Sequence, residues 1–135
     1  MAFTQAIIKN PTRSIPNFPK ASSTVTTQQT VLMWASGLAV EADNTATPAT
    51  VIGVCNQTTA AADAITQIPA IETFKKDVWI ADCTNTANAA HDGQYMILTD
   101  SGHVNNTGTT NTSGIVQQVG VYSAVNANQI LVQFV

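Results

Sequence analysis

The chain has 135 residues, of which only 10% are charged, and its formal net charge at pH 7 is −3. Average soluble domains carry roughly 25% charged residues, so this chain is poor in charge, with Thr, Asn and Gln in place of Lys and Glu. The length fits one domain with a single core. Because the chain lacks long apolar runs and runs of charge, we expect neither a membrane span nor binding to nucleic acid.

Residues 1–30 differ from the rest of the chain in charge and in proline content. They contain three of the five prolines, no glycine, and three basic residues without an acidic one, whereas residues 31–135 have a net charge of −6. Each proline fixes its own φ and favours extended geometry in the residue before it. This composition predicts an extended N-terminal arm over residues 1–30, and a disordered tail is the alternative.

This leader also carries large apolar side chains that an extended segment cannot bury against itself. They follow no sustained period, so they need another surface to cover them. That surface is either the body of the same chain, a sister subunit or another protein. The side chains are Phe3, Ile7, Ile8, Ile15 and Phe18.

From residue 31 onward, short runs of β-branched and apolar residues alternate with loops rich in Gly, Asn, Asp and Thr. The pattern predicts strands at 31–35, 38–40, 51–55, 65–71, 78–83, 95–99, 115–122 and 130–135. A helical signal at 58–64 is too short to be stable alone. We therefore predict an all-β fold, with residues 31–135 forming a single small β-barrel or sandwich domain.

The second half of this body partly repeats the first. The segment VLMWASGLAV at 31–40 is similar to YMILTDSGHV at 95–104, and both contain a Ser-Gly turn. Residues 51–54 are similar to 118–121, and residues 68–71 are similar to 130–133. The repetition predicts a fold of two similar halves. Convergence of two unrelated segments on the same turn chemistry is the alternative.

The residue types that carry catalysis or bind metals form no recognisable motif. Cys55 and Cys83 lie at the ends of predicted strands without a CxxC spacing, and His91 and His103 are 12 residues apart. The eight carboxylates are dispersed, and no phosphate-binding glycine pattern occurs. We predict no catalytic, cofactor-binding or metal site and interpret both thiols as small buried side chains. A cysteine–histidine nucleophilic pair is the alternative.

The two tryptophans are the other candidates for binding. Trp34 and Trp79 both lie within apolar runs, so we expect both to be buried in the core. A sugar-stacking platform beside the Asn-rich loops is the alternative interpretation.

The order of these features resembles the capsid decoration proteins, also called cement or head-stabilising proteins, of tailed double-stranded DNA bacteriophages. The similarity covers about residues 31–135 and is carried by TVIGVCNQ, KKDVWIADC, DGQYMILTDSGHV and the closing QQVGVYSAVNANQILVQFV. The resemblance implies a non-enzymatic viral structural protein of the virion, made in the host cytoplasm and needing no cofactor. Such proteins add to the outside of the capsid shell.

The resemblance also implies the partners and the mode of action. The partners are the major capsid protein and other copies of the chain, with a trimer favoured, and they include neither nucleic acid nor a membrane. The protein is expected to stabilise the head by bridging neighbouring capsomers through many weak contacts. The alternative function is a carbohydrate- or host-surface-binding β-module of the fibre or adhesin type.

On this resemblance, the leader lies across a neighbouring capsid or sister subunit. Its apolar side chains act as anchors and its basic side chains orient the contact. The expected interface residues of the arm are Phe3, Ile7, Ile8, Lys9, Arg13, Ile15, Phe18 and Lys20. A chain that lacks residues 1–20 is expected to keep a folded body and to bind capsids poorly.

Overall fold

The computed structural model describes residues 3–7, 15–73, 77–110, 112–122 and 127–135. This part of the chain is nearly all β, as predicted, with two short 3-10 turns, η1 (Ala61–Asp63) and η2 (Ala89–His91). The helical signal at 58–64 corresponds to η1. The strands are β1 (Phe3–Ile7), β2 (Asn17–Pro19), β3 (Val31–Ala35), β4 (Leu38–Glu41), β5 (Val51–Cys55), β6 (Gln67–Ile71), β7 (Val78–Asp82), β8 (Tyr95–Met96), β9 (Leu98–Asp100), β10 (His103–Val104), β11 (Val116–Val121) and β12 (Gln129–Phe134).

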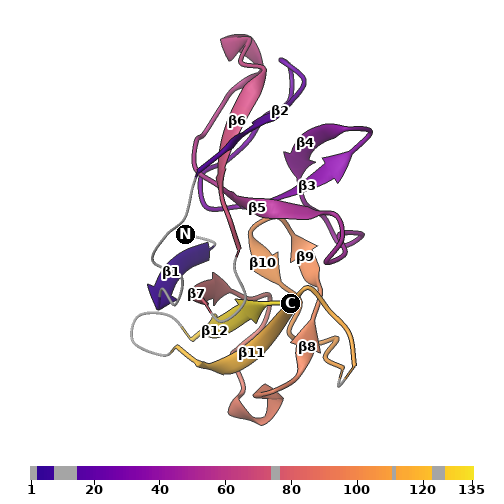
Figure 1. Ribbon diagram of the computed structural model, residues 1–135. Helices are drawn as coiled ribbons and strands as arrows, with labels where there is room; N and C mark the ends of the chain where they lie inside the picture. The colour runs from indigo at the N-terminus through magenta and orange to yellow at the C-terminus, as the bar shows by residue number, and fades with distance from the viewer. Residues whose placement is uncertain (1–2, 8–14, 74–76, 111, 123–126) are drawn as a thin grey trace.

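Two five-stranded antiparallel sheets pack as a sandwich that does not close into a barrel. The first sheet has the order β2-β6-β5-β3-β4 and the second has the order β1-β7-β12-β11-β8, with β9 and β10 forming a separate two-stranded ribbon. The first sheet fills the upper half of the molecule in Figure 1, and the second sheet and the ribbon fill the lower half. The prediction of a small all-β sandwich is confirmed.

The two halves follow the same strand order. Strands β2, β6, β5, β3 and β4 of the first half correspond in turn to β7, β12, β11, the pair β8–β9, and β10 of the second. Each half also curls in the same way, because β4 contacts β2 and β10 contacts β7. The similarity between 31–71 and 95–133 therefore reflects two similar halves. Among the described strands, β1 has no counterpart.

The Ser-Gly dipeptide makes the turn of a hairpin in each half. Between β3 and β4, Ser36 and Gly37 have φ values of 51° and 77°, and the positive φ at both positions is typical of the two-residue turn that matches strand twist. Between β9 and β10, the Asp100 carboxylate instead accepts a hydrogen bond from the Gly102 N–H at 2.8 Å. The same turn signal is thus stabilised in two different ways.

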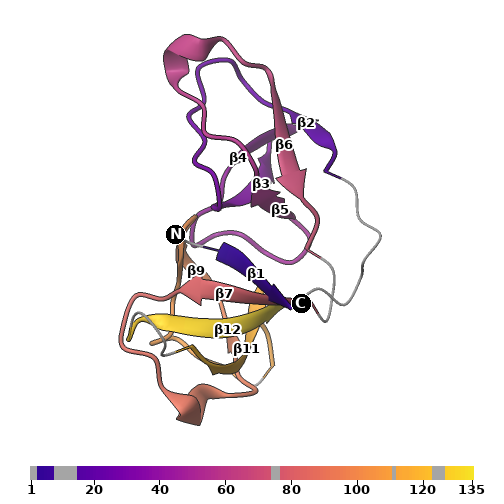
Figure 2. The ribbon, with the colours of Figure 1, turned by 90° about the vertical axis from the view of Figure 1, so that its left-hand side faces the viewer.

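The N-terminal leader is extended, and its described strands belong to the two sheets. Strand β1 pairs antiparallel with β7, and β2 pairs with β6, so each is an edge strand (Figure 2). Phe3 is only 1% exposed and packs against Phe134, with ring centroids 5.7 Å apart. The expectation that residues 1–20 can be removed without harm to the body is wrong, because the deletion removes two strands and a core side chain.

The main hydrophobic core is shared by the two halves. Val31 and Val54 from the first half pack in one cluster with Trp79, Ile130 and Phe134 from the second. A second, smaller cluster lies within the first sheet and contains Leu32, Ala39, Cys55, Ile68 and Ala70, with Phe18 and Ile52 packed against it. The shared core explains why the chain forms one sandwich instead of two independent small domains.

Candidate functional site

The structure places the predicted interface residues of the leader in different environments. Phe3 lies in the main core, and Phe18 is partly buried on the first sheet. Ile15 is one of the exposed large apolar side chains, and Ile7 pairs with Val78 through its main chain. Ile8, Lys9 and Arg13 lie outside the described residues. Contact of these residues with a neighbour therefore stays a prediction.

Lys20 has a structural role within its own chain. Its side chain is only 2% exposed, and its Nζ donates to the carbonyl oxygens of Ala21 at 3.0 Å and of Thr24 at 2.8 Å. Charge-assisted hydrogen bonds of this kind are among the stronger ones in proteins. The charge of Lys20 is therefore used to hold the turn that follows β2.

The two tryptophans lie in opposite environments. Trp79 is 1% exposed in the main core, as expected, but Trp34 is 38% exposed, which corrects the expectation that both are buried. Trp34 meets Phe18 edge to face, with ring centroids 5.7 Å apart. Thr99, which precedes the second Ser-Gly turn by the same two residues, bonds to the Thr84 hydroxyl instead. The aromatic pair is thus specific to the first half.

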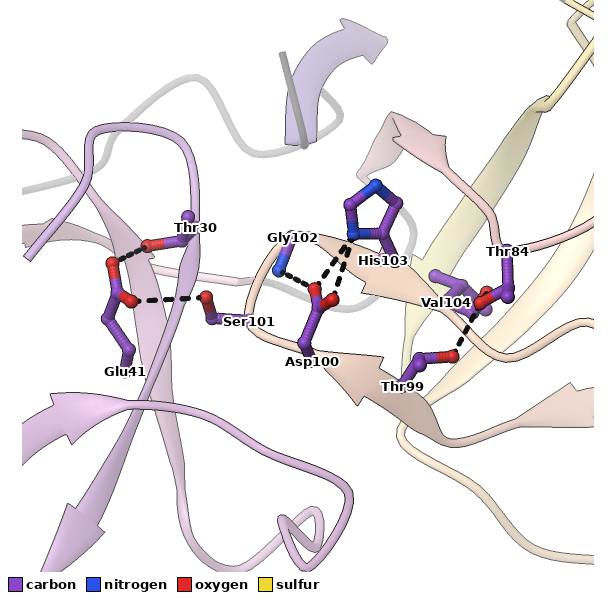
Figure 3. Close-up of polar contacts among 9 residues, drawn as sticks. All are labelled: Thr30, Glu41, Thr84, Thr99, Asp100, Ser101, Gly102, His103 and Val104. Carbon is purple, nitrogen blue, oxygen red and sulfur yellow. Dashed lines mark hydrogen bonds and ion pairs between the residues drawn. The ribbon is translucent and has the colours of Figure 1, made fainter.

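A polar junction joins the two halves at the β9–β10 turn (Figure 3). The carboxylate of Glu41 accepts hydrogen bonds from the Thr27 N–H at 2.7 Å, the Thr30 hydroxyl at 3.2 Å and the Ser101 hydroxyl at 3.4 Å. The Ser101 carbonyl also accepts from the Val31 N–H at 2.8 Å. Glu41 therefore acts as an acceptor that ties both halves together.

Asp100 and His103 form an ion-pair geometry on the same turn, and both are more than half exposed or close to it. The His103 Nδ1 lies 2.9 Å from Asp100 Oδ1, as drawn in Figure 3. Partial burial raises the pKa of Asp100, but hydrogen bonds from His103 and from the Gly102 N–H outweigh it and hold the pKa below its usual value. The pair stabilises the turn.

Cys83 shares a surface cavity of about 300 Å³ with Asp100 and His103. Burial raises the pKa of the Cys83 thiol to about 11, and the negative charge of Asp82 acts in the same direction. Burial also raises the pKa of Cys55. Since the thiolate is the nucleophilic form, this geometry gives Cys83 no activated nucleophile at neutral pH. The interpretation of both cysteines as buried free thiols is confirmed.

Within the described ranges, His, Cys, Asp and Glu side chains form no group of three or more that could hold a metal ion. In the same part of the chain, no helix has the length and apolar character needed to cross a membrane.

The largest surface cavity among those described is an apolar groove of about 400 Å³ where the two halves meet. The loop at 46–48 of the first half forms one side, and Tyr95, Ile97 and Val135 of the second half form much of the other. Ile97 and Val135 are exposed. A groove lined in this way suits an uncharged, apolar contact.

Exposed large apolar side chains occur on both halves of the described molecule. They are Ile15, Val25 and Trp34 on the first half, and Ile97, Val119 and Val135 on the second. The sequence prediction included only Ile15 and Trp34 as candidates. Val119 lies in a predicted strand, but an irregularity in register between Gln118 and Gly120 leaves it outside the β11–β12 pairing. A β-bulge of this kind redirects a side chain.

Comparisons of the chain with protein-family models, with curated proteins and with solved structures found no significant match.

Proposed function

We propose that this protein is a viral structural protein that binds the outside of a bacteriophage capsid shell and bridges neighbouring capsomers. One observation carries the proposal: two halves with the same strand order each present three exposed, uncharged, large side chains. Single exposed apolar residues are ordinary on proteins. Their presence on both halves of a two-part molecule supports simultaneous contact with two neighbouring subunits.

The energetics of bridging favour this arrangement. Two weak contacts made by one rigid body add as avidity, because the second contact forms at a high effective concentration once the first has formed. The shared core fixes the distance between the two halves, so both contacts are held in a geometry suited to a regular lattice. We propose the major capsid protein as the partner, with further copies of this chain, favoured as a trimer, around the same lattice point.

The low charge of the chain supports the same function. A surface that is to be covered by neighbours loses little hydration energy when Thr and Asn replace Lys and Glu, because desolvating a charge is costly unless it is paired. In the proposed complex the leader adds to the contact through Ile15 and through the residues on either side of Lys9 and Arg13. Phe3 and Lys20 support the fold instead.

The decisive experiment mixes the purified protein with undecorated capsids and images the particles. Ordered surface density at symmetry-related positions supports the proposal. Folded protein that leaves the capsids bare contradicts it.

Variants then test bridging. Ile15→Ser changes one half and Val119→Ser changes the other, and each is expected to weaken binding several-fold. The double variant is expected to lose avidity and bind much more weakly than either single variant. Ala62→Ser on the exposed η1 turn is the matched control. Equal binding by the control and the double variant would argue against contact through both halves.

A second candidate function is a carbohydrate- or host-surface-binding module, and the exposed Trp34 beside Phe18 favours it. An exposed indole face can stack on a pyranose ring, although apolar protein partners use the same surface. Binding of host-surface polysaccharide that Trp34→Ala abolishes, together with unchanged capsid binding, would favour this candidate over the first.

A further inference from the structure

Gln5 and Trp79 are direct neighbours across the β1–β7 pair. Side chains at directly opposed positions of antiparallel strands lie on the same face of the sheet. Trp79 points into the main core, so Gln5 lies on the core-facing side of β1. The two side chains are therefore adjacent beneath the edge of the second sheet.

Both side chains carry a buried N–H group that has no hydrogen-bond partner among the described residues. The atoms are Nε2 of Gln5 and Nε1 of Trp79. Buried donors without an acceptor are rare in folded proteins, and each one needs an explanation. Two such donors on neighbouring residues point to one missing acceptor.

A cavity of about 290 Å³ lies at this position, and both residues line it. Apolar side chains of Phe3, Val54 and Ile71 form part of its wall, and the amides of Gln28 and Asn56 form another part. None of the described residues that line it is charged. The volume is at the small end of the roughly 300–1,000 Å³ typical of ligand pockets.

We propose that this cavity binds a neutral, hydroxyl-rich molecule the size of a single sugar ring, with one ligand oxygen accepting from Trp79 Nε1 and Gln5 Nε2. A hydroxyl group both donates and accepts, as do the amides in the wall. An anionic ligand would be left with an uncompensated charge in an uncharged cavity, which is unfavourable. The apolar wall residues suit the C–H faces of a sugar ring.

This site does not depend on the proposed capsid role, and it is separate from the exposed Trp34 surface. Its residues come from β1, β7 and the end of β5, whereas Trp34 lies at the tip of the β3–β4 hairpin. The leader strand β1 supplies one of the two donors, so the cavity exists only when β1 is paired with β7.

Nuclear magnetic resonance of the indole N–H groups tests the proposal directly. The protein has two tryptophans, so a Trp34→Phe variant leaves one indole signal and assigns Trp79. The wild-type protein is titrated with methyl α-D-glucopyranoside, methyl α-D-mannopyranoside, methyl β-D-galactopyranoside and myo-inositol. At least one of them is expected to cause a saturable shift of the Trp79 signal while the Trp34 signal stays in place.

The variant Gln5→Leu is expected to weaken that binding at least ten-fold, because it removes one donor and keeps the side-chain size. Gln67→Leu, at an exposed position of β6, is the matched control and is expected to bind like the wild type. If none of the four compounds shifts the Trp79 signal and the indole instead shows exchange with a bound water, the donors serve a structural water only and the proposal is overturned.

Discussion

Gly53 lies so close to the main-chain carbonyl of Ile71 that a Cβ atom at residue 53 would come within 2.5 Å of that oxygen. The two residues belong to the neighbouring strands β5 and β6. Gly120 is the corresponding glycine of the second half, and a Cβ there meets only the side chain of Leu131 at 3.5 Å. The two halves share a glycine in the sequence, but only the first requires it for main-chain packing.

Gly53→Ala is therefore expected to lower the free energy of unfolding by about 1–3 kcal/mol, since an added methyl group must displace the strand. Gly120→Ala is the matched control and is expected to change it by less than about 0.5 kcal/mol. Urea unfolding monitored by circular dichroism measures both. Equal effects of the two substitutions would show that β5 and β6 are not as close as described.

Lys20→Met is expected to destabilise the fold by about 1–3 kcal/mol, because the carbonyls of Ala21 and Thr24 lose a charged donor. In a capsid-binding assay well below the melting temperature, this variant is expected to bind normally. Lys9→Met removes the same charge from the leader and is expected to weaken capsid binding. Loss of binding in Lys20→Met without loss of stability would return Lys20 to the interface.

Glu41→Gln is expected to lower the free energy of unfolding by about 1–2 kcal/mol. The substitution replaces one carboxylate oxygen by an N–H group, which faces donors from Thr27, Thr30 or Ser101. Ser101→Ala removes only the longest of these contacts, so a smaller loss is expected. Thermal unfolding measures the difference, and a larger loss in Ser101→Ala would contradict the role given to Glu41.

Tryptophan fluorescence is expected to contain two distinct emissions. Trp34→Phe leaves Trp79, whose buried indole is expected to emit at short wavelength and to resist quenching by acrylamide. In the wild type, the exposed Trp34 adds a fraction that acrylamide quenches readily. Quenching that is identical in the two proteins would contradict the exposure of Trp34.

The raised pKa of Cys83 predicts a loss of stability in alkaline solution. The thiol ionises near its usual value of 9.0 in the unfolded chain and at about 11 in the folded protein. Between these values the unfolded state binds fewer protons than the folded state, so the free energy of unfolding falls as the pH rises. Urea midpoints at pH 8 and pH 10.5 measure the fall, which is expected to be smaller in Cys83→Ala. The same fall in both proteins would exclude Cys83 as the cause.

Strands that announce themselves locally were predictable from the sequence. The run at 51–55 is β-branched and bounded by polar residues, and β5 has the same limits. The pairing of β1 with β7 was not predictable, because strand partners about 70 residues apart leave no local signal. The proline content indicated an extended leader but not the surface that covers it.

The exposed residues were harder to predict than the buried ones. Apolar runs predict burial, and Leu32 and Trp79 follow this rule. Trp34 departs from it because it lies at the end of β3, next to the hairpin turn, where Phe18 covers only part of its ring. Lys20 departs in the other direction, since a single lysine is normally solvated. Both exceptions depend on contacts with residues distant in space or bound through the main chain.

The placement of β1 has a consequence for the order in which the protein folds. The strands of the first sheet are complete once residue 71 has been made, whereas β1 must wait for β7 and the main core must wait for β12. Joining β1 to β7 closes a long loop, which is slow and entropically unfavourable. We therefore expect the first half to fold during synthesis while Phe3 remains uncovered, so that the earliest residues of the chain are among the last to reach their final position.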